Sequence, residues 1–126
     1  MNNNQQHPLL LLDNSAVMTV LNEGEFKCYN LSLNEAKQIL EVHEEKDILR
    51  CFSNADIENV MYEHLGIAKR NFEYKKIYSM RPGQDAIVFK LYITPSETQP
   101  IVRVDGVEAK KIQNIYVYCQ YLTRIN

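Results

Sequence analysis

The fold is decided by the stretch from Met80 to Leu91, which reads Met-Arg-Pro-Gly-Gln-Asp-Ala-Ile-Val-Phe-Lys-Leu. Pro82-Gly83 is a turn signal, and residues 86–89 after it are apolar at successive rather than alternate positions. Such a run is typical of a strand that is covered on both faces of a sheet. We therefore predict a central strand here, with the segment from Tyr74 to Met80 as its neighbour across a hairpin turn.

The composition predicts one compact domain with a single core. The chain has 126 residues, of which 45% are hydrophobic and 24% are charged. Residues 1–8 are polar and rich in Asn and Gln, so we expect a flexible arm there and a single α/β domain over 9–126. The formal net charge of −2 disfavours generic binding to nucleic acid, which depends on a positive surface.

The cysteines and the apolar runs indicate a cytoplasmic protein. Cys28, Cys51 and Cys119 are odd in number and lack metal-ligand spacing, so we expect reduced, buried thiols and neither a disulfide nor a metal site. The apolar run from Leu9 to Leu12 is too short to span a bilayer or to form a signal peptide, and no basic residue precedes it. We expect no membrane partner and no cofactor.

The remaining pattern predicts an α/β (α+β) fold with a mixed sheet of about five strands, two main helices and a short third helix. Further strands are expected at 9–12, 26–31, 48–52 and 115–125, and helices after 32–35, which form a capping box, and after 53–56. Asp105-Gly106 fits either a hairpin turn or the start of the short helix, and the residues that follow, through Ile112, favour the helix.

The second face of the last strand predicts a partner chain. Tyr116, Tyr118 and Leu122 lie on that face at alternate positions, and together they are more apolar than a solvated edge strand normally is. We therefore expect a homodimer.

Two predicted strand ends offer polar groups to a ligand. Asn14 and Ser15 follow the first strand, where small polar side chains form either the floor of a ligand site or an ordinary turn. Ser53, Asn54 and Ala55 follow the third strand at the start of a helix. The free amides of that helix terminus can bind a phosphate, or Ser53 or Asn54 can cap them.

The order of these elements resembles that of a known family, the viral type III CRISPR anti-CRISPR ring nucleases and their cellular relatives. Those proteins are small α/β dimers that bind cyclic tetra-adenylate. The resemblance covers nearly the whole chain from about Leu9 onward, and three strings carry it, namely Asp13-Asn14-Ser15-Ala16, Leu31-Ser32-Leu33-Asn34-Glu35-Ala36 and Pro82-Gly83-Gln84-Asp85-Ala86-Ile87. It implies a homodimer that binds a cyclic oligoadenylate on its two-fold axis, in the cytoplasm of a prokaryote or of a virus-infected prokaryotic host.

The chain departs from the family at two positions that carry chemistry. The family histidine that is regarded as the general acid matches Asn54, whose amide cannot protonate a leaving group. The family's Arg-Pro-Pro-Glu loop corresponds to residues 94–97, so Glu97 keeps the glutamate while Thr94 replaces the arginine. The resemblance thus implies Asn54 and Glu97 as catalytic positions, with ligand contacts from Asn14, Ser15, Ser53, Ala55 and Thr94.

Loss of a general acid slows catalysis by about 10²- to 10⁴-fold, which predicts a slow ring nuclease or a sponge that sequesters its ligand. On this hypothesis Asn54 separates binding from turnover; the alternative is that it only caps the helix. A different class of function also stays open, a non-enzymatic interaction protein or DNA-binding regulator that kept the fold and lost the nucleotide. The nucleotide is favoured if basic side chains converge on the 53–55 corner, the candidates being Lys69, Arg70, Lys75, Lys76, Arg81 and Lys90.

Overall fold

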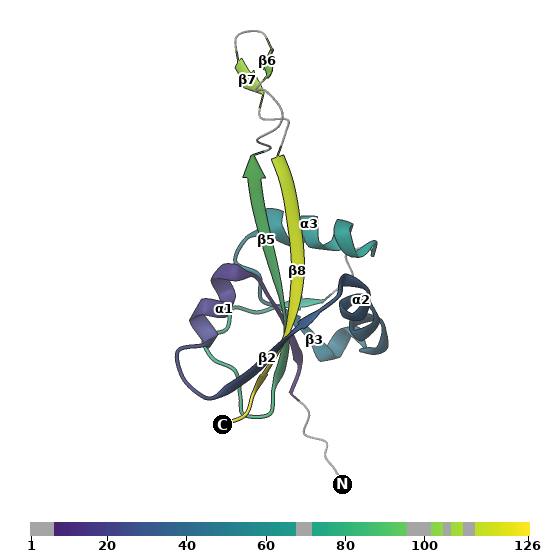
Figure 1. The fold of residues 1–126 in the computed structure, drawn as a ribbon. Helices are drawn as coiled ribbons and strands as arrows, with labels where there is room; N and C mark the ends of the chain where they lie inside the picture. Colours follow the sequence, from purple (N-terminus) through teal and green to yellow (C-terminus); the bar gives the residue numbers. More distant parts are fainter. Residues whose placement is uncertain (1–6, 68–71, 96–101, 105–106, 110–112) are drawn as a thin grey trace.

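The protein folds as a mixed sheet with helices on both faces (Figure 1). The computed structural model describes residues 7–67, 72–95, 102–104, 107–109 and 113–126. The predicted α/β class is confirmed. Its elements are β1 (Leu9–Leu12), α1 (Asn14–Val20), β2 (Phe26–Leu31), α2 (Leu33–Val42), the 3-10 helix η1 (Glu45–Asp47), β3 (Ile48–Arg50), α3 (Ala55–Leu65), β4 (Glu73–Tyr74), β5 (Asp85–Pro95), β6 (Val102–Val104), β7 (Val107–Ala109) and β8 (Gln113–Arg124).

The main sheet has six strands in the order β2-β8-β5-β1-β3-β4. β1 is parallel to both β3 and β5, and β4 is parallel to β3, whereas β8 is antiparallel to β5 and to β2. The carboxyl ends of β1, β3, β4 and β5 therefore point to the same edge of the sheet. A ligand at that edge can be contacted by the segments that follow several strands.

The prediction of a central strand at 86–89 is confirmed, but the predicted hairpin partner is wrong. β5 pairs with β1 and β8, and the segment after Tyr74 does not join it in the sheet. The physical reason is burial, because the place between β5 and β3 is covered by an apolar cluster on each face of the sheet. β1 consists of four leucines, whereas the segment from Tyr74 to Met80 carries Lys75 and Lys76, which stay exposed.

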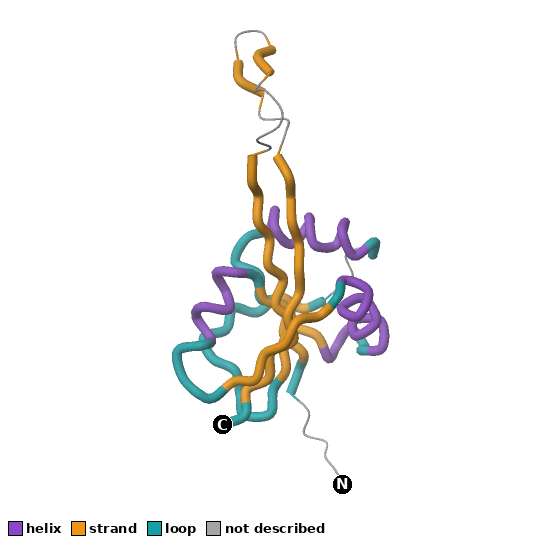
Figure 2. The backbone as a smooth tube through the Cα atoms, viewed as in Figure 1, coloured by secondary structure: helices purple, strands orange, loops and turns teal. Residues whose placement is uncertain are grey.

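Each face of the sheet has its own apolar cluster. Leu9 and Leu11 of β1 pack with α2 and α3 on one face, and Leu10 and Leu12 pack with α1 on the other. Figure 2 shows α1 on one side of the strands and α2 and α3 on the other. The chain therefore moves to opposite faces after β1 and after β3.

Helix α1 was not predicted, because residues 13–16 were interpreted as a turn. Asp13 is the N-cap of α1, and its carboxylate accepts a hydrogen bond from the amide of Ala16 at 2.8 Å. The helix is only seven residues long and holds three β-branched residues, Val17, Thr19 and Val20, which have low helix propensity. Its apolar contact with the sheet through Val17 and Val20 stabilises it instead.

Helices α2 and α3 are confirmed where the sequence placed them. The capping box forms as predicted, since the Ser32 hydroxyl accepts from the amide of Glu35 at 3.0 Å and the Glu35 carboxylate accepts from the amide of Ser32 at 2.8 Å. These hydrogen bonds lower the pKa of Glu35. α3 ends at Gly66, which has a left-handed φ of 70°.

β5 and β8 extend beyond the other strands as a two-stranded ribbon, and the β6–β7 hairpin lies past its end (Figure 1). The short helix predicted to start at Asp105-Gly106 is wrong over 107–109, because β6 and β7 pair antiparallel with Val104 opposite Val107. The two strands agree with the hairpin alternative, since valines at 102, 104 and 107 favour strands over a helix, while Asp105 and Gly106 lie outside the described residues.

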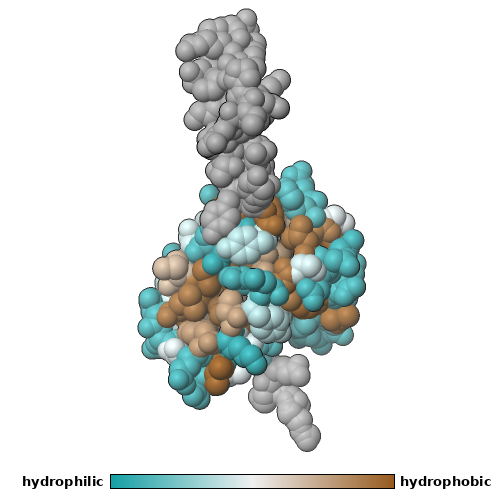
Figure 3. Space-filling model, viewed as in Figure 1, coloured by the Kyte–Doolittle hydropathy of each residue, from teal (hydrophilic) through white to brown (hydrophobic). Residues whose placement is uncertain are grey.

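The last strand lies inside the sheet, between β2 and β5, and is not an edge. Leu122, one of the residues that motivated the dimer, is only 3% exposed because it packs in the cluster under α1. The predicted dimer therefore loses part of its original support and stays a prediction. Large apolar side chains that do stay exposed include Met18 and Val42, and Figure 3 shows apolar residues in separate areas with polar residues between them.

The three cysteines differ in burial. Cys51 and Cys119 are buried as predicted, and burial raises the pKa of each thiol to about 12. Cys28 is exposed on edge strand β2, so the expectation of a buried thiol is wrong there. Among the described residues, no helix is long and apolar enough to cross a bilayer.

Candidate functional site

The candidate site lies at the sheet edge where β1 and β3 end. After β1 the chain enters α1 on one face, and after β3 it enters α3 on the other. Ligands of open α/β sheets bind at such a divergence, outside the carboxyl ends of the strands. The structure brings five of the predicted site residues to this edge, namely Asn14 and Ser15 at the start of α1 and Ser53, Asn54 and Ala55 at the start of α3.

Asp13 joins these two corners. Its Oδ1 accepts from the Ala16 amide at 2.8 Å and from the Ser53 hydroxyl at 3.0 Å. Its Oδ2 accepts from the backbone amides of Ser53 at 2.9 Å and of Asn54 at 3.1 Å. The side chain is 0% exposed. Sequence reasoning missed this role, although a carboxylate directly after four buried leucines was the available signal.

The bonds from Asp13 change what the start of α3 can bind. The amides of Ser53 and Asn54 already meet a carboxylate, so they are not free donors for a phosphate. Asn54 is the N-cap of α3, and its Oδ1 accepts from the amides of Asp56 at 2.9 Å and Ile57 at 3.1 Å. The geometry thus provides the capping role that the sequence left open for Asn54, while a role in catalysis stays a prediction.

A pocket of about 300 Å³ lies at this edge. Ser15 and Ser53, both predicted as ligand contacts, line it from the two helix starts, and Lys76 lines it from the segment after β4. The other lining residues are Ala16, Thr19, Cys51, Phe52, Tyr74 and Ile77. Four hydroxyl side chains and one ammonium group form the polar part of this lining, an arrangement that suits an anion with hydrogen-bond acceptors.

Sequence reasoning missed Thr19 and Tyr74 as site residues. It named Lys76 only as one of six basic candidates, because Lys75-Lys76 also fits a solvated pair of lysines. Cys51 also lines this pocket, and because burial raises its pKa to about 12 the thiol stays protonated at neutral pH. A nucleophilic role for this cysteine is therefore not favoured.

Asn14 adds an unusual group beside the pocket. Its side-chain oxygen Oδ1 is buried and has no hydrogen-bond partner among the described residues. A buried acceptor without a donor costs about 1–3 kcal/mol. Asn14 is the first residue of α1 and adjoins Asp13 and Ser15, so this oxygen lies close to the helix start that lines the pocket.

One predicted site residue, Thr94, is not brought to this edge within one protomer. Thr94 is six residues beyond Val88, the residue of β5 that pairs with the end of β1. At about 3.3 Å per strand residue, its backbone lies roughly 20 Å farther along the ribbon. Glu97 lies outside the described residues.

The convergence of basic side chains that would favour a nucleotide occurs in part. Lys76 lines the edge pocket, and Lys75, Lys76 and Arg81 line a second pocket beside it. Lys90 lies in β5 and lines neither of these pockets. Lys69 and Arg70 lie outside the described residues.

No protein-family model matches this chain, and no curated protein matches it. The resemblance to the ring nucleases therefore stays a prediction. In the ranges that the structure describes, no group of three His, Cys, Asp or Glu side chains is placed to hold a metal ion.

Proposed function

We propose that this protein binds a cyclic oligoadenylate at the edge pocket and sequesters it, with slow cleavage or none. The observation that carries the proposal is the pocket lining. Ser15 and Ser53 are far apart in the sequence, both were expected as ligand contacts, and they line one pocket together with Lys76. The Ser15 hydroxyl can donate to a phosphate or ribose oxygen, and the ammonium group can neutralise a phosphate. The Ser53 hydroxyl donates its hydrogen to Asp13, so its oxygen can accept from a ribose hydroxyl.

The edge pocket is large enough for only part of a cyclic oligoadenylate, which fits the expectation that two copies of the chain bind one ring. At about 300 Å³ it is at the small end of the range of about 300–1,000 Å³ for ligand sites, so it suits one part of a large cyclic ligand. A two-fold axis presents the same pocket twice. Two copies that face one another would contact opposite parts of one ring, and this is how a cyclic ligand would be held.

The state of Asn54 supports sequestration over turnover. In a cyclic oligoadenylate the ribose 2′-hydroxyl attacks its own phosphodiester, so a protein mainly has to orient that hydroxyl and stabilise charge. Asn54 stands where the resemblance expects an acid, and its Oδ1 is bound to two amides of α3. With no proton to give to the leaving oxygen, we expect cleavage to be slower by about 10²- to 10⁴-fold than with a general acid.

One observation favours the second candidate, an interaction protein that has lost the nucleotide. Asp13 occupies the amides of Ser53 and Asn54 and puts a buried negative charge next to the place where a phosphate would bind. A phosphate near the edge pocket would then depend on Lys76 to offset that charge.

The test measures binding and cleavage with the same samples. The wild-type protein is titrated calorimetrically with cyclic tetra-adenylate and cyclic hexa-adenylate, and ligand recovered after a long incubation is analysed for linear products. Lys76→Gln should weaken binding at least about tenfold, because it removes a charge-assisted contact. Lys46→Gln is the matched control, since Lys46 is exposed and precedes β3 at the opposite end of that strand.

Intact ligand bound by the wild type, with Lys76→Gln weakened and Lys46→Gln unchanged, supports the proposal. An absence of binding to either ring at millimolar ligand would reject it and favour the interaction protein. Rapid conversion to linear products would reject the sequestration part alone.

A further inference from the structure

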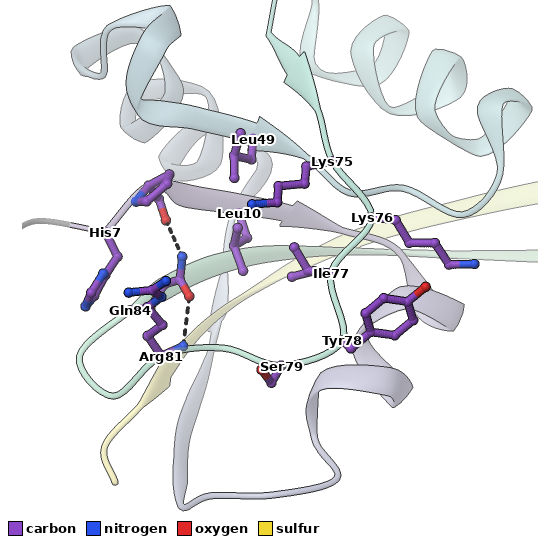
Figure 4. A pocket seen from close by; sticks show the side chains of 11 residues that line it. His7, Leu10, Leu49, Lys75, Lys76, Ile77, Tyr78, Ser79, Arg81 and Gln84 are labelled. Carbon is purple, nitrogen blue, oxygen red and sulfur yellow. Dashed lines mark hydrogen bonds between the residues drawn. The ribbon is translucent and has the colours of Figure 1, made fainter.

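A second pocket, of about 460 Å³, lies beside the edge pocket and is more basic. It is formed where the segment after β4 crosses the sheet on its way to β5 (Figure 4). Lys76 and Ile77 line both pockets, so the two are neighbours. The other lining residues are His7, Pro8, Leu10, Leu49, Lys75, Tyr78, Ser79, Arg81 and Gln84.

The charge of this pocket is concentrated and of one sign. Lys75, Lys76 and Arg81 line it, and none of the residues described as lining it is acidic. In the described part of the chain, no carboxylate forms a salt bridge with any of these three cations. This concentration stands out because the whole chain has a formal net charge of −2. Such a pocket attracts a compact anion that carries more than one negative charge.

The rim of the pocket is held in place by a buried side chain. Gln84 is 6% exposed, and both ends of its amide are used. Its Nε2 donates to the carbonyl of Pro8 at 2.9 Å, and its Oε1 accepts from the amide of Arg81 at 2.9 Å. Figure 4 shows these two bonds, with His7 and Arg81 on one side of the pocket and Lys75 on the other. The Arg81 backbone is therefore positioned before any ligand arrives.

The remaining lining suits a flat apolar group. Leu10 is 1% exposed and forms the floor with Leu49 and Ile77, which pack against the same cluster. Tyr78 is 68% exposed, and the Lys76 ammonium lies 5.8 Å from the centre of its ring. An exposed tyrosine ring beside a cation can stack on a planar group while the cation contacts an attached anion.

We propose that this pocket is a separate ligand site for a small phosphate monoester that carries a planar ring, of the class of nucleoside monophosphates. The phosphate is bound by Arg81 and Lys75, and the ring lies over the apolar floor next to Tyr78. Arginine presents a planar fork that matches two phosphate oxygens, while lysine adds a point charge. The site does not depend on the proposed function, because Arg81 and Lys75 do not line the edge pocket.

The experiment compares three probes, AMP, adenosine and inorganic phosphate, by calorimetric titration of the full chain. AMP should bind more tightly than either adenosine or phosphate alone. Arg81→Gln and Lys75→Gln should each weaken AMP binding about tenfold. Lys27→Gln is the matched control, because Lys27 is exposed on edge strand β2 and lines neither pocket. Circular dichroism of each variant verifies that it folds.

A further variant separates this site from the edge pocket. Ser15→Glu adds a negative charge to the edge pocket, which shares Lys76 with this pocket, so it should weaken AMP binding less than Arg81→Gln does. The inference is overturned if AMP does not bind at millimolar concentration, if adenosine binds as tightly as AMP, or if Lys27→Gln weakens AMP binding as much as Arg81→Gln does. It is also overturned if Ser15→Glu abolishes AMP binding while Arg81→Gln does not, a result that would place AMP in the edge pocket.

Discussion

Replacement of Asp13 by alanine should destabilise the protein more than its small change in volume implies. The carboxylate is fully buried and accepts from three backbone amides, those of Ala16, Ser53 and Asn54. It therefore joins the start of α1 to the start of α3, across 40 residues of sequence. Asp13→Ala leaves all three amides without this acceptor.

The expected loss in the free energy of unfolding follows from the three amides that lose their acceptor. An unsatisfied buried donor costs about 1–3 kcal/mol, and loss of an N-cap alone costs about 0.5–2 kcal/mol. Ser53 and Asn54 are exposed, so water can reach their amides, and the lower end of the range applies to both. We expect a total loss of about 3–4 kcal/mol, a large part of the roughly 5–15 kcal/mol that stabilises a typical domain.

The assay is equilibrium unfolding in urea. For a loss of this size and a typical slope of about 1–3 kcal/mol per molar urea, the midpoint should fall by about 1–4 M. Asp13→Asn keeps one acceptor oxygen and should lie between wild type and Asp13→Ala. Asp47→Ala, at an exposed position in η1, should stay within about 0.5 kcal/mol of wild type. A loss below about 1 kcal/mol for Asp13→Ala would refute the idea that this carboxylate joins the two corners.

Two other predictions concern single side chains. Asn54→His should lower stability by about 1 kcal/mol, because the acceptor of the Asp56 and Ile57 amides is lost. It should also raise single-turnover cleavage of cyclic tetra-adenylate by about tenfold or more, because a histidine can protonate the leaving oxygen; lower stability with unchanged cleavage would contradict Asn54 as the switch between binding and turnover. In the native protein at pH 8, a thiol reagent should modify exposed Cys28 quickly. Cys51 and Cys119 should react only after unfolding, because burial raises the pKa of each thiol to about 12. Mass spectrometry counts the modified thiols, and rapid modification of more than one would contradict the described burial.

The sequence predicted those elements whose signals are local. Four successive leucines and the run at 86–89 identified the two buried strands, and Ser32 and Glu35 identified the start of α2. The sequence did not predict which strand pairs with β5 in the sheet. The neighbour of β5 was decided by which distant strand buries the most apolar surface, and no local pattern around Tyr74 contains that comparison.

In the candidate site, too, the sequence predicted the residues with a local signal and not those that depend on distant parts of the chain. Ser15 and Ser53 follow strand ends, and that position is visible in the sequence. The role of Asp13 depends on amides 40 residues away, and Lys76 reaches the pocket only because the segment after β4 crosses the sheet. The role of Asp13 and the position of Lys76 both depend on the pairing of β1 with β3, which sequence periodicity does not specify.

The edge pocket is the centre of the proposed function, and Ser15 allows the most direct test of it. Ser15 is the second residue of α1, where an acidic side chain is favourable to the helix by about 0.3–1 kcal/mol. Ser15→Glu should therefore fold normally while it repels a phosphate in the pocket. Ser15→Gln matches it in size but carries no charge.

The deciding measurement is the dissociation constant of cyclic tetra-adenylate for wild type, Ser15→Gln and Ser15→Glu, at an ionic strength of about 0.15 M, where screening acts over about 8 Å. We predict that Ser15→Gln binds within about threefold of wild type and that Ser15→Glu binds at least about tenfold more weakly than Ser15→Gln. Equal affinity for the two variants would contradict a cyclic oligoadenylate in the edge pocket.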